Sequence, residues 1–196
     1  MNTLNSIFRV RQRITPMVNR YAVHAVQADG KEGPLVAVAR HKRMALKEQV
    51  RFYADEDRRT PLFSFKARQL VDLGAAYDVL DRSGVPIGSF RKDFARLLLR
   101  STRHLDQPAL EGMVGSERGM SVAIVRRLWD LMPVVDAIPF FIPYHFDFHA
   151  PDGSRVLALT KKMRVRDSYV LEIFDRRLDW RLAVAQAVAL DALQSR

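Results

Sequence analysis

A nearly apolar stretch close to the end of the chain, residues 182–193, has only two polar side chains, Gln186 and Asp191. On a helix, these and the flanking polar residues scatter around the axis, so there is no polar face for a surface helix. Twelve residues rise only about 18 Å, whereas the hydrocarbon core of a membrane is about 30 Å thick. The stretch therefore predicts a helix surrounded by protein, whose alanines let a narrow barrel wall approach closely.

Strand signals dominate the rest of the chain. Phe8, Val10 and Ile14 alternate with arginines, which is the period of a half-buried strand. Three segments contain two strand-like runs separated by a turn rich in Asp and Gly, and they predict hairpins at residues 21–42, 77–92 and 144–162. Further strands are expected at residues 49–55, 61–68, 96–102 and 164–174. Ten to twelve strands without the regularly alternating helices of a parallel sheet predict an all-β closed barrel or a sandwich.

One additional helix is expected around residues 116–131, where Ser116 would cap the start and Pro133 would end it. A chain of 196 residues fits a single core. We therefore expect one domain over residues 1–196, with a helical insertion around residues 105–140.

The composition narrows the chemistry and the surroundings. The absence of cysteine excludes disulfides, thiolate metal sites and cysteine nucleophiles, and it suits a reducing cytoplasm. Arginines interrupt the first residues, so we expect no export signal and a cytoplasmic protein. The net charge of +10 favours an anionic partner, or it serves solubility alone.

Basic residues recur on single faces of the expected strands. Arg9, Arg11 and Arg13 share one face at spacings of about 6–7 Å, and guanidinium groups match phosphates. If several such faces converge, each residue would contribute about 1 kcal/mol to a reversible, salt-sensitive association with an anionic surface. The alternative is a solvated face without a ligand. The candidate anion-binding residues are Arg9, Arg11, Arg13, Lys66, Arg68, Arg91, Lys92, Arg96, Arg100, Lys161, Arg164 and Arg166.

The order of these motifs and the terminal helix resemble the Tubby C-terminal-like superfamily, in particular its LURP-one-related and phospholipid-scramblase-like branch. The residues that carry the resemblance are 21–33, 50–68, 77–92, 144–162 and 169–196. The resemblance implies a barrel of about twelve strands wrapped around a buried hydrophobic C-terminal α-helix. It also implies a module that binds phosphoinositide or other anionic phospholipid headgroups through basic residues on the barrel wall.

Scramblase-like relatives are also associated with calcium and lipid movement. The matching segment of this chain spreads its acids out and mixes them with arginines, whereas calcium needs six to eight oxygen ligands close together. We therefore expect no calcium site and no other cofactor. Because the helix is too short to span a membrane, we expect peripheral binding at the inner membrane face, without a transmembrane span.

Two other functions remain open. His145 and Asp147 share a strand face and would supply two ligands of a metal-dependent barrel oxygenase, which requires an open, polar lumen. The second is a structural or protein-interaction module, in which Phe140 to Pro143 would form an apolar loop that contacts a protein partner. The sequence lacks the basic and aromatic interleaving of nucleic-acid modules. We expect a non-enzymatic binding module.

Overall fold

The computed structural model describes residues 6–14, 18–42, 49–68, 76–93, 102–117, 145–162 and 168–192. These residues form twelve strands followed by one helix. The elements are β1 (Ser6–Ile14), β2 (Val18–Val26), β3 (Glu32–Lys42), β4 (Gln49–Tyr53), β5 (Pro61–Ala67), β6 (Ala76–Asp81), β7 (Pro86–Asp93), β8 (Thr102–Gln107), β9 (Leu110–Glu117), β10 (His145–His149), β11 (Arg155–Lys162), β12 (Ser168–Ile173) and α2 (Trp180–Ala192).

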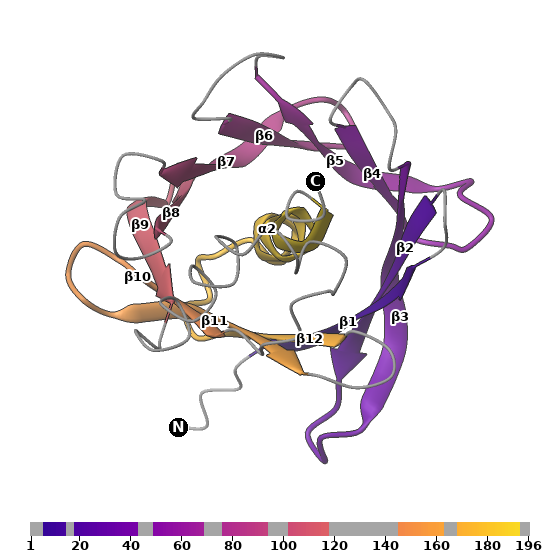
Figure 1. Ribbon diagram of the computed structural model, residues 1–196, viewed down its shortest axis with the longest axis horizontal. Coiled ribbons are helices and arrows are strands. Elements are labelled where there is room, and N and C mark those ends of the chain that lie inside the picture. The colour runs from indigo at the N-terminus through magenta and orange to yellow at the C-terminus, as the bar shows by residue number, and fades with distance from the viewer. Residues whose placement is uncertain are drawn as a thin grey trace, which may run out of the picture.

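The strands form one closed barrel (Figure 1). Each strand pairs antiparallel with its neighbours in the chain, and β1 also pairs with β12. A closed meander leaves no unpaired strand edge in the wall, which satisfies the backbone donors and acceptors on both sides of every strand. The barrel predicted from the sequence is confirmed, and the sandwich is excluded.

Alternation along the strands separates the lumen from the outer wall. In β1, Val10 and Gln12 are buried and Arg11 and Arg13 are exposed. The same period places the aromatic rings of the other strands inside. The phenylalanines of β4 and β5 stack there, with 4.1 Å between the ring centroids of Phe52 and Phe63. Stacked and edge-to-face aromatic pairs of this kind fill the space between the wall and the central helix.

Helix α2 runs through the lumen, surrounded by the strands (Figure 1). Every side chain from residue 182 to residue 190 is at most 1% exposed. Gly88 of β7 lies against this helix, since a Cβ atom at Gly88 would come within 2.8 Å of Leu182 Cδ2. The buried helix predicted from the sequence is confirmed, and the lack of a side chain at Gly88 allows the close approach to Leu182. In the part of the chain that the structure describes, no helix is long and apolar enough to span a membrane.

The helix expected at residues 116–131 and the insertion expected at residues 105–140 were both predicted to begin where the structure has strands. Residues 110–117 form β9, and Ser116 lies opposite Asp147 of β10 instead of capping a helix. The beginning of the expected insertion, residues 105–117, likewise belongs to β8 and β9. The alternation of buried and exposed side chains in these strands follows from their pairing in the wall, which overrides weak local signals. Residues 118–140 lie outside the described residues.

Gln186 lies in the middle of α2 and is only 1% exposed. Its Nε2 and Oε1 atoms have no hydrogen-bond partner among the described residues. Because a buried amide without a partner costs free energy, we expect Gln186→Met to stabilise the protein by about 1 kcal/mol. In a chain of this size, the thermal midpoint should rise by about 2–4 °C, measured by calorimetry. Gln186→Glu should lower it, and a Gln186→Met variant less stable than the wild type would contradict the prediction.

Candidate functional site

Four exposed arginines face one another on four consecutive strands of the outer wall. Arg13 of β1 lies opposite Arg20 of β2, Arg20 lies opposite Arg40 of β3, and Arg40 lies opposite Arg51 of β4. We call these four residues the arginine row. Neighbouring strands are about 4.8 Å apart, so the row extends over about 14 Å around the barrel. It ends at β5, where Ser64 lies opposite Arg51.

Like charges at directly opposed positions destabilise a sheet. The guanidinium of Arg20 is the largest influence on Arg40 and lowers its pKa, and burial and Arg58 lower it further, whereas Glu56 acts in the opposite direction. Arg58 belongs to the loop between β4 and β5 and has a φ of 61°, an unfavourable conformation for a residue with a Cβ atom. Arg20 and Arg40 therefore repel each other, although solvent screens this repulsion because both side chains are exposed.

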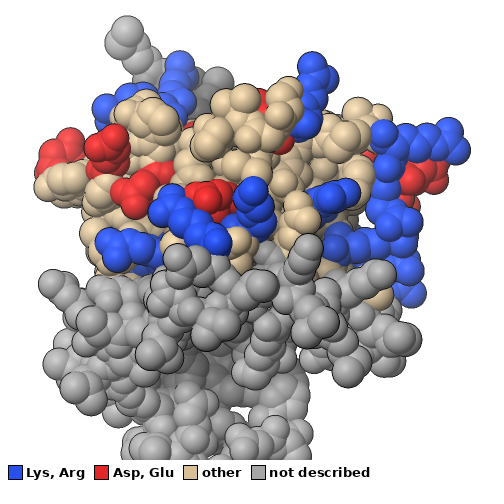
Figure 2. All heavy atoms as spheres, turned by 90° about the horizontal axis from the view of Figure 1, so that it is seen from above, with Lys and Arg blue, Asp and Glu red and all other residues tan. Residues whose placement is uncertain are grey.

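Other arginines of the wall lie beside carboxylates, although Arg9 and Arg11 share a single one. Arg9 and Arg11 form ion pairs with Glu32, at 3.7 Å and 2.8 Å. Arg68 donates to Asp78 at 2.8 Å. Among the described residues, no ion pair within 4.0 Å connects a member of the arginine row to an acid. Figure 2 shows acidic and basic side chains interspersed over one face, and several basic side chains beside acidic ones at its right edge, the side on which β2 and β3 lie in Figure 1.

The remaining sequence-predicted residues do not join the row. Lys66 on β5 is exposed and lies opposite Gln49, on the diagonal from Arg51, whereas Arg91 on β7 is exposed and lies opposite Ala76. Lys161 is a correction, because it lies opposite the buried Tyr169 and its Nζ is 5.4 Å from the centroid of that ring, on the inner face. Lys161 follows the buried Leu157 and Leu159 at a spacing of two residues, and this spacing indicated the inner face in the sequence. The side chain of Lys92 and all of Arg96, Arg100, Arg164 and Arg166 lie outside the described residues.

Of the candidate residues, only Arg13 belongs to the arginine row, and sequence reasoning missed Arg20, Arg40 and Arg51. The spacing within one strand identifies residues that share a face, but it does not give the register between strands. Arg20, Arg40 and Arg51 are separated along the chain and become neighbours only through the pairing of β2, β3 and β4.

The residues proposed for an oxygenase lie on the outside of the barrel. Phe146 and Phe148 point inward and are fully buried, which places His145 and Asp147 on the other face of β10. Asp147 Oδ1 accepts hydrogen bonds from Arg155 Nε at 3.1 Å and Nη2 at 2.8 Å, and His145 Nδ1 lies 3.1 Å from Thr160 Oγ1. An oxygenase of this kind requires an open, polar lumen, whereas the lumen of this barrel is filled by α2. Among the described residues, no three His, Asp or Glu side chains form a metal-binding group. Phe140 to Pro143, where the sequence predicted an apolar loop, lie outside the described residues.

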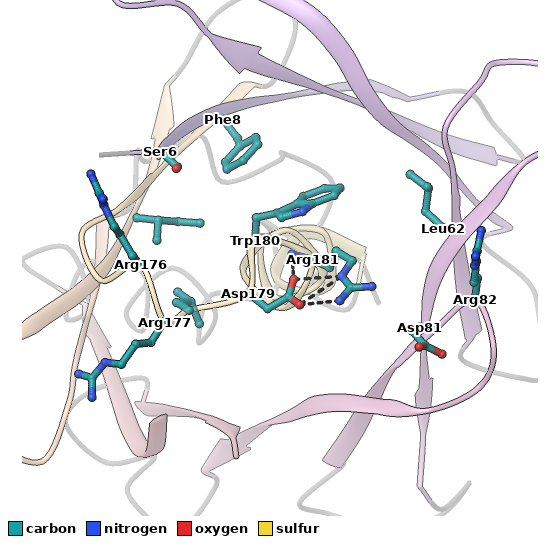
Figure 3. A pocket seen from close by; sticks show the side chains of 12 residues that line it. Ser6, Phe8, Leu62, Asp81, Arg82, Arg176, Arg177, Asp179, Trp180 and Arg181 are labelled. Carbon is teal, nitrogen blue, oxygen red and sulfur yellow. Dashed lines mark hydrogen bonds and ion pairs between the residues drawn. The ribbon is translucent and has the colours of Figure 1, made fainter. Parts of the chain in front are cut away.

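A cavity of about 870 Å³ opens at the end of the barrel where α2 begins (Figure 3). Trp180, the first residue of α2, is held between two phenylalanines. The ring of Phe8 stacks on it at 5.7 Å between centroids, and the ring of Phe63 meets it edge to face at 5.6 Å. Trp180 and Leu62 therefore give the cavity an apolar floor.

The start of α2 is fixed by polar contacts around this cavity. Asp179 accepts a hydrogen bond from the backbone N–H of Arg181 at 2.8 Å and forms an ion pair with its guanidinium at 2.7 Å. This contact raises the pKa of Arg181. Gln107 of β8 accepts from the backbone N–H of Asp179 at 3.0 Å and donates to the backbone carbonyl of Arg177. The first turn of the helix is thereby attached to the wall.

A closed antiparallel barrel around a central C-terminal helix defines a Tubby-like barrel protein. The chain belongs to the LURP-one-related family, whose model matches residues 35–191. The resemblance predicted from the sequence is confirmed at the level of this family. A search of curated proteins finds no match. A solved porin-like protein from Bacteroides uniformis ATCC 8492 is similar over 87% of this chain and 96% of its own, with 8% identity and a TM-score of 0.26, which is too low to support an argument.

Proposed function

We propose that the protein is a non-enzymatic module that binds anionic phospholipid headgroups, phosphoinositides in particular, through the arginine row. It would associate peripherally with the cytoplasmic face of a membrane. Membership of a family of Tubby-like barrels supports a binding function. The single observation that carries the proposal is the set of four adjacent exposed arginines on β1 to β4.

The geometry favours a ligand with several phosphate groups. Guanidinium groups bind phosphate through parallel N–H···O bonds, and adjacent arginines at strand spacing offer such bonds to neighbouring phosphates. Bound phosphates would also remove the repulsion between Arg20 and Arg40.

The next row of the wall supports a lipid headgroup over a free anion. Ala22 of β2 lies opposite Val38 of β3, which lies opposite Tyr53 of β4. All three are half-buried, so an apolar and aromatic strip runs beside the arginine row. Tyrosine is favoured where an apolar and an aqueous phase meet. If the arginines bind the headgroup, this strip would lie next to the glycerol backbone and the first carbons of the acyl chains.

We expect Arg20→Gln/Arg40→Gln to weaken binding to phosphatidylcholine vesicles that contain phosphatidylinositol 4,5-bisphosphate. At about 1 kcal/mol per arginine, the loss should be about 30-fold, measured by vesicle flotation. Binding of the wild type should fall as the KCl concentration rises, because exposed charges are screened. Since the variant removes like-charge neighbours, its thermal midpoint should be equal to or above that of the wild type.

The matched control is Arg68→Gln/Arg155→Gln, which removes the same net charge from two arginines that are paired with Asp78 and Asp147. This variant should keep most of the vesicle binding. If the wild type binds acidic vesicles no better than neutral ones, lipid binding is wrong. If the control loses as much binding as the row variant, net charge and not the arginine row accounts for it.

A further inference from the structure

We infer that the cavity at the mouth of the barrel is a second binding site, for a small anionic amphiphile with a flat apolar group and a carboxylate, sulfonate or phosphate. This site is separate from the arginine row. Ser6 and Phe8, at the start of β1, line the cavity, whereas Arg13 lies near the other end of that strand. On β1 the two sites lie at opposite ends of the strand, whereas on β5 Leu62 of the cavity is two residues from Ser64, which lies opposite Arg51.

The floor of the cavity suits a flat apolar group. Trp180 is only partly buried, although Phe8 and Phe63 hold its ring in place. An aromatic ring fixed before the ligand arrives loses little conformational entropy on binding. Stacking on such a ring adds to the free energy gained by apolar burial.

The rim of the cavity carries an excess of positive charge. Four arginines and two aspartates line it. Both aspartates already have partners: Asp179 binds Arg181, and Asp81 accepts hydrogen bonds from the backbone N–H groups of Ser83 and Val85, both at 2.8 Å. Asp81 keeps its negative charge, but the four arginines outnumber the two aspartates, so the lining residues retain a net positive charge.

Two of the four arginines remain available. Arg177 is bound to Asp175 at 2.6 Å, and Arg181 to Asp179. Arg82 and Arg176 are exposed and form no ion pair within 4.0 Å among the described residues. They lie on opposite sides of the opening in Figure 3, with Trp180 between them. Both lie at the rim and not over Trp180, so a ligand has to extend from Trp180 to the rim to meet a free guanidinium.

The shape of the cavity limits the ligand. Below Trp180 the lumen is closed, because Leu182 and Ala183 are completely buried. A long acyl chain has no path into the barrel and would remain in water. A volume of about 870 Å³ lies within the range of small-molecule sites. The ligand is therefore short and lies across the mouth.

The test uses 8-anilinonaphthalene-1-sulfonate, which combines flat rings and a sulfonate, with the full-length chain. The chain has two tryptophans, so Trp129→Phe leaves Trp180 as the only one. We expect saturable binding, with quenching of Trp180 fluorescence by energy transfer to the probe. Adding Arg82→Gln/Arg176→Gln should weaken binding about fivefold, as expected for two partly exposed charge contacts.

The control is Arg20→Gln/Arg40→Gln, which has the same net charge and should bind the probe like the wild type. In the vesicle assay the result should be reversed: Arg82→Gln/Arg176→Gln, the mouth variant, should bind vesicles like the wild type, and Arg20→Gln/Arg40→Gln should lose binding. The two proposals can therefore fail separately. Equal losses of probe binding in both variants would overturn the mouth site. So would probe emission without quenching of Trp180, or equally tight binding of uncharged N-phenyl-1-naphthylamine that the mouth variant leaves unchanged.

Discussion

Ala187→Glu is expected to prevent stable folding. Ala187 lies in the middle of α2 and is 1% exposed, with the barrel wall on every side. A carboxylate there would lie in an apolar lumen without a partner. The expected loss is at least about 4 kcal/mol, a large part of the roughly 5–15 kcal/mol that stabilises a typical domain. Circular dichroism and thermal denaturation should show a protein largely unfolded or aggregated at 37 °C.

The matched control is Ala109→Glu, which makes the same chemical change in the exposed turn between β8 and β9. Its thermal midpoint should be within about 2 °C of the wild type, as is usual for surface substitutions. A folded, soluble Ala187→Glu protein with a wild-type midpoint would show that α2 is not enclosed by the barrel.

Gly88→Ala is expected to produce the second-largest effect on stability. A Cβ atom on Gly88 would collide with the backbone carbonyl oxygen of Asp106 and would lie 2.8 Å from Leu182 Cδ2. Neither neighbour moves easily, because the first belongs to the paired strand β8 and the second is completely buried. We expect a loss of about 3 kcal/mol, which lowers the thermal midpoint by about 6–12 °C in calorimetry.

Gly30→Ala separates this steric effect from the general loss of a glycine. Gly30 lies in the turn after β2 at a φ of 77°, and a Cβ atom there would meet nothing within 4 Å. The control should lose only about 1–2 kcal/mol, from backbone strain. If Gly88→Ala costs no more than Gly30→Ala, the close approach of β7 to α2 is wrong.

The architecture followed from two local signals in the sequence. Alternation in β1 and β10 placed their inner and outer faces correctly, because each residue of a strand points to the side opposite its neighbours. The length and the apolar character of α2 excluded both a surface helix and a membrane span, which left the lumen. Both signals are local, so one sequence was sufficient to read them.

The strands β8 and β9 were missed for a physical reason. Residues 102–117 mix charged residues with Gly112 and Gly115, so their alternation is weak. Gly115 is required by the neighbouring strand, since a Cβ atom there would collide with the ring of Phe148. A glycine selected by a contact between distant segments resembles a loop residue when only its local sequence is considered.

The candidate site was less accessible to sequence analysis than the fold. An interaction between strands depends on register, and the arginine row comes from four strands whose loops differ in length. Arg11 and Arg13 look equivalent in the sequence, yet Glu32 of β3 pairs with Arg11, whereas Arg13 faces Arg20. Which basic residues remain available to a ligand is thus decided by partners from other segments.

The hydrogen bonds between β1 and β12 also determine the order in which the protein can fold. These strands are separated by more than 150 positions along the chain, so their pairing requires the closure of a very large loop. During synthesis, β1 and the apolar inner face of the growing sheet have to wait for β12 and α2, the last described elements. Until then the sheet is open at both edges and can pair with other chains. Folding should therefore be slow, and the unfinished barrel is the state most exposed to aggregation and most in need of chaperones.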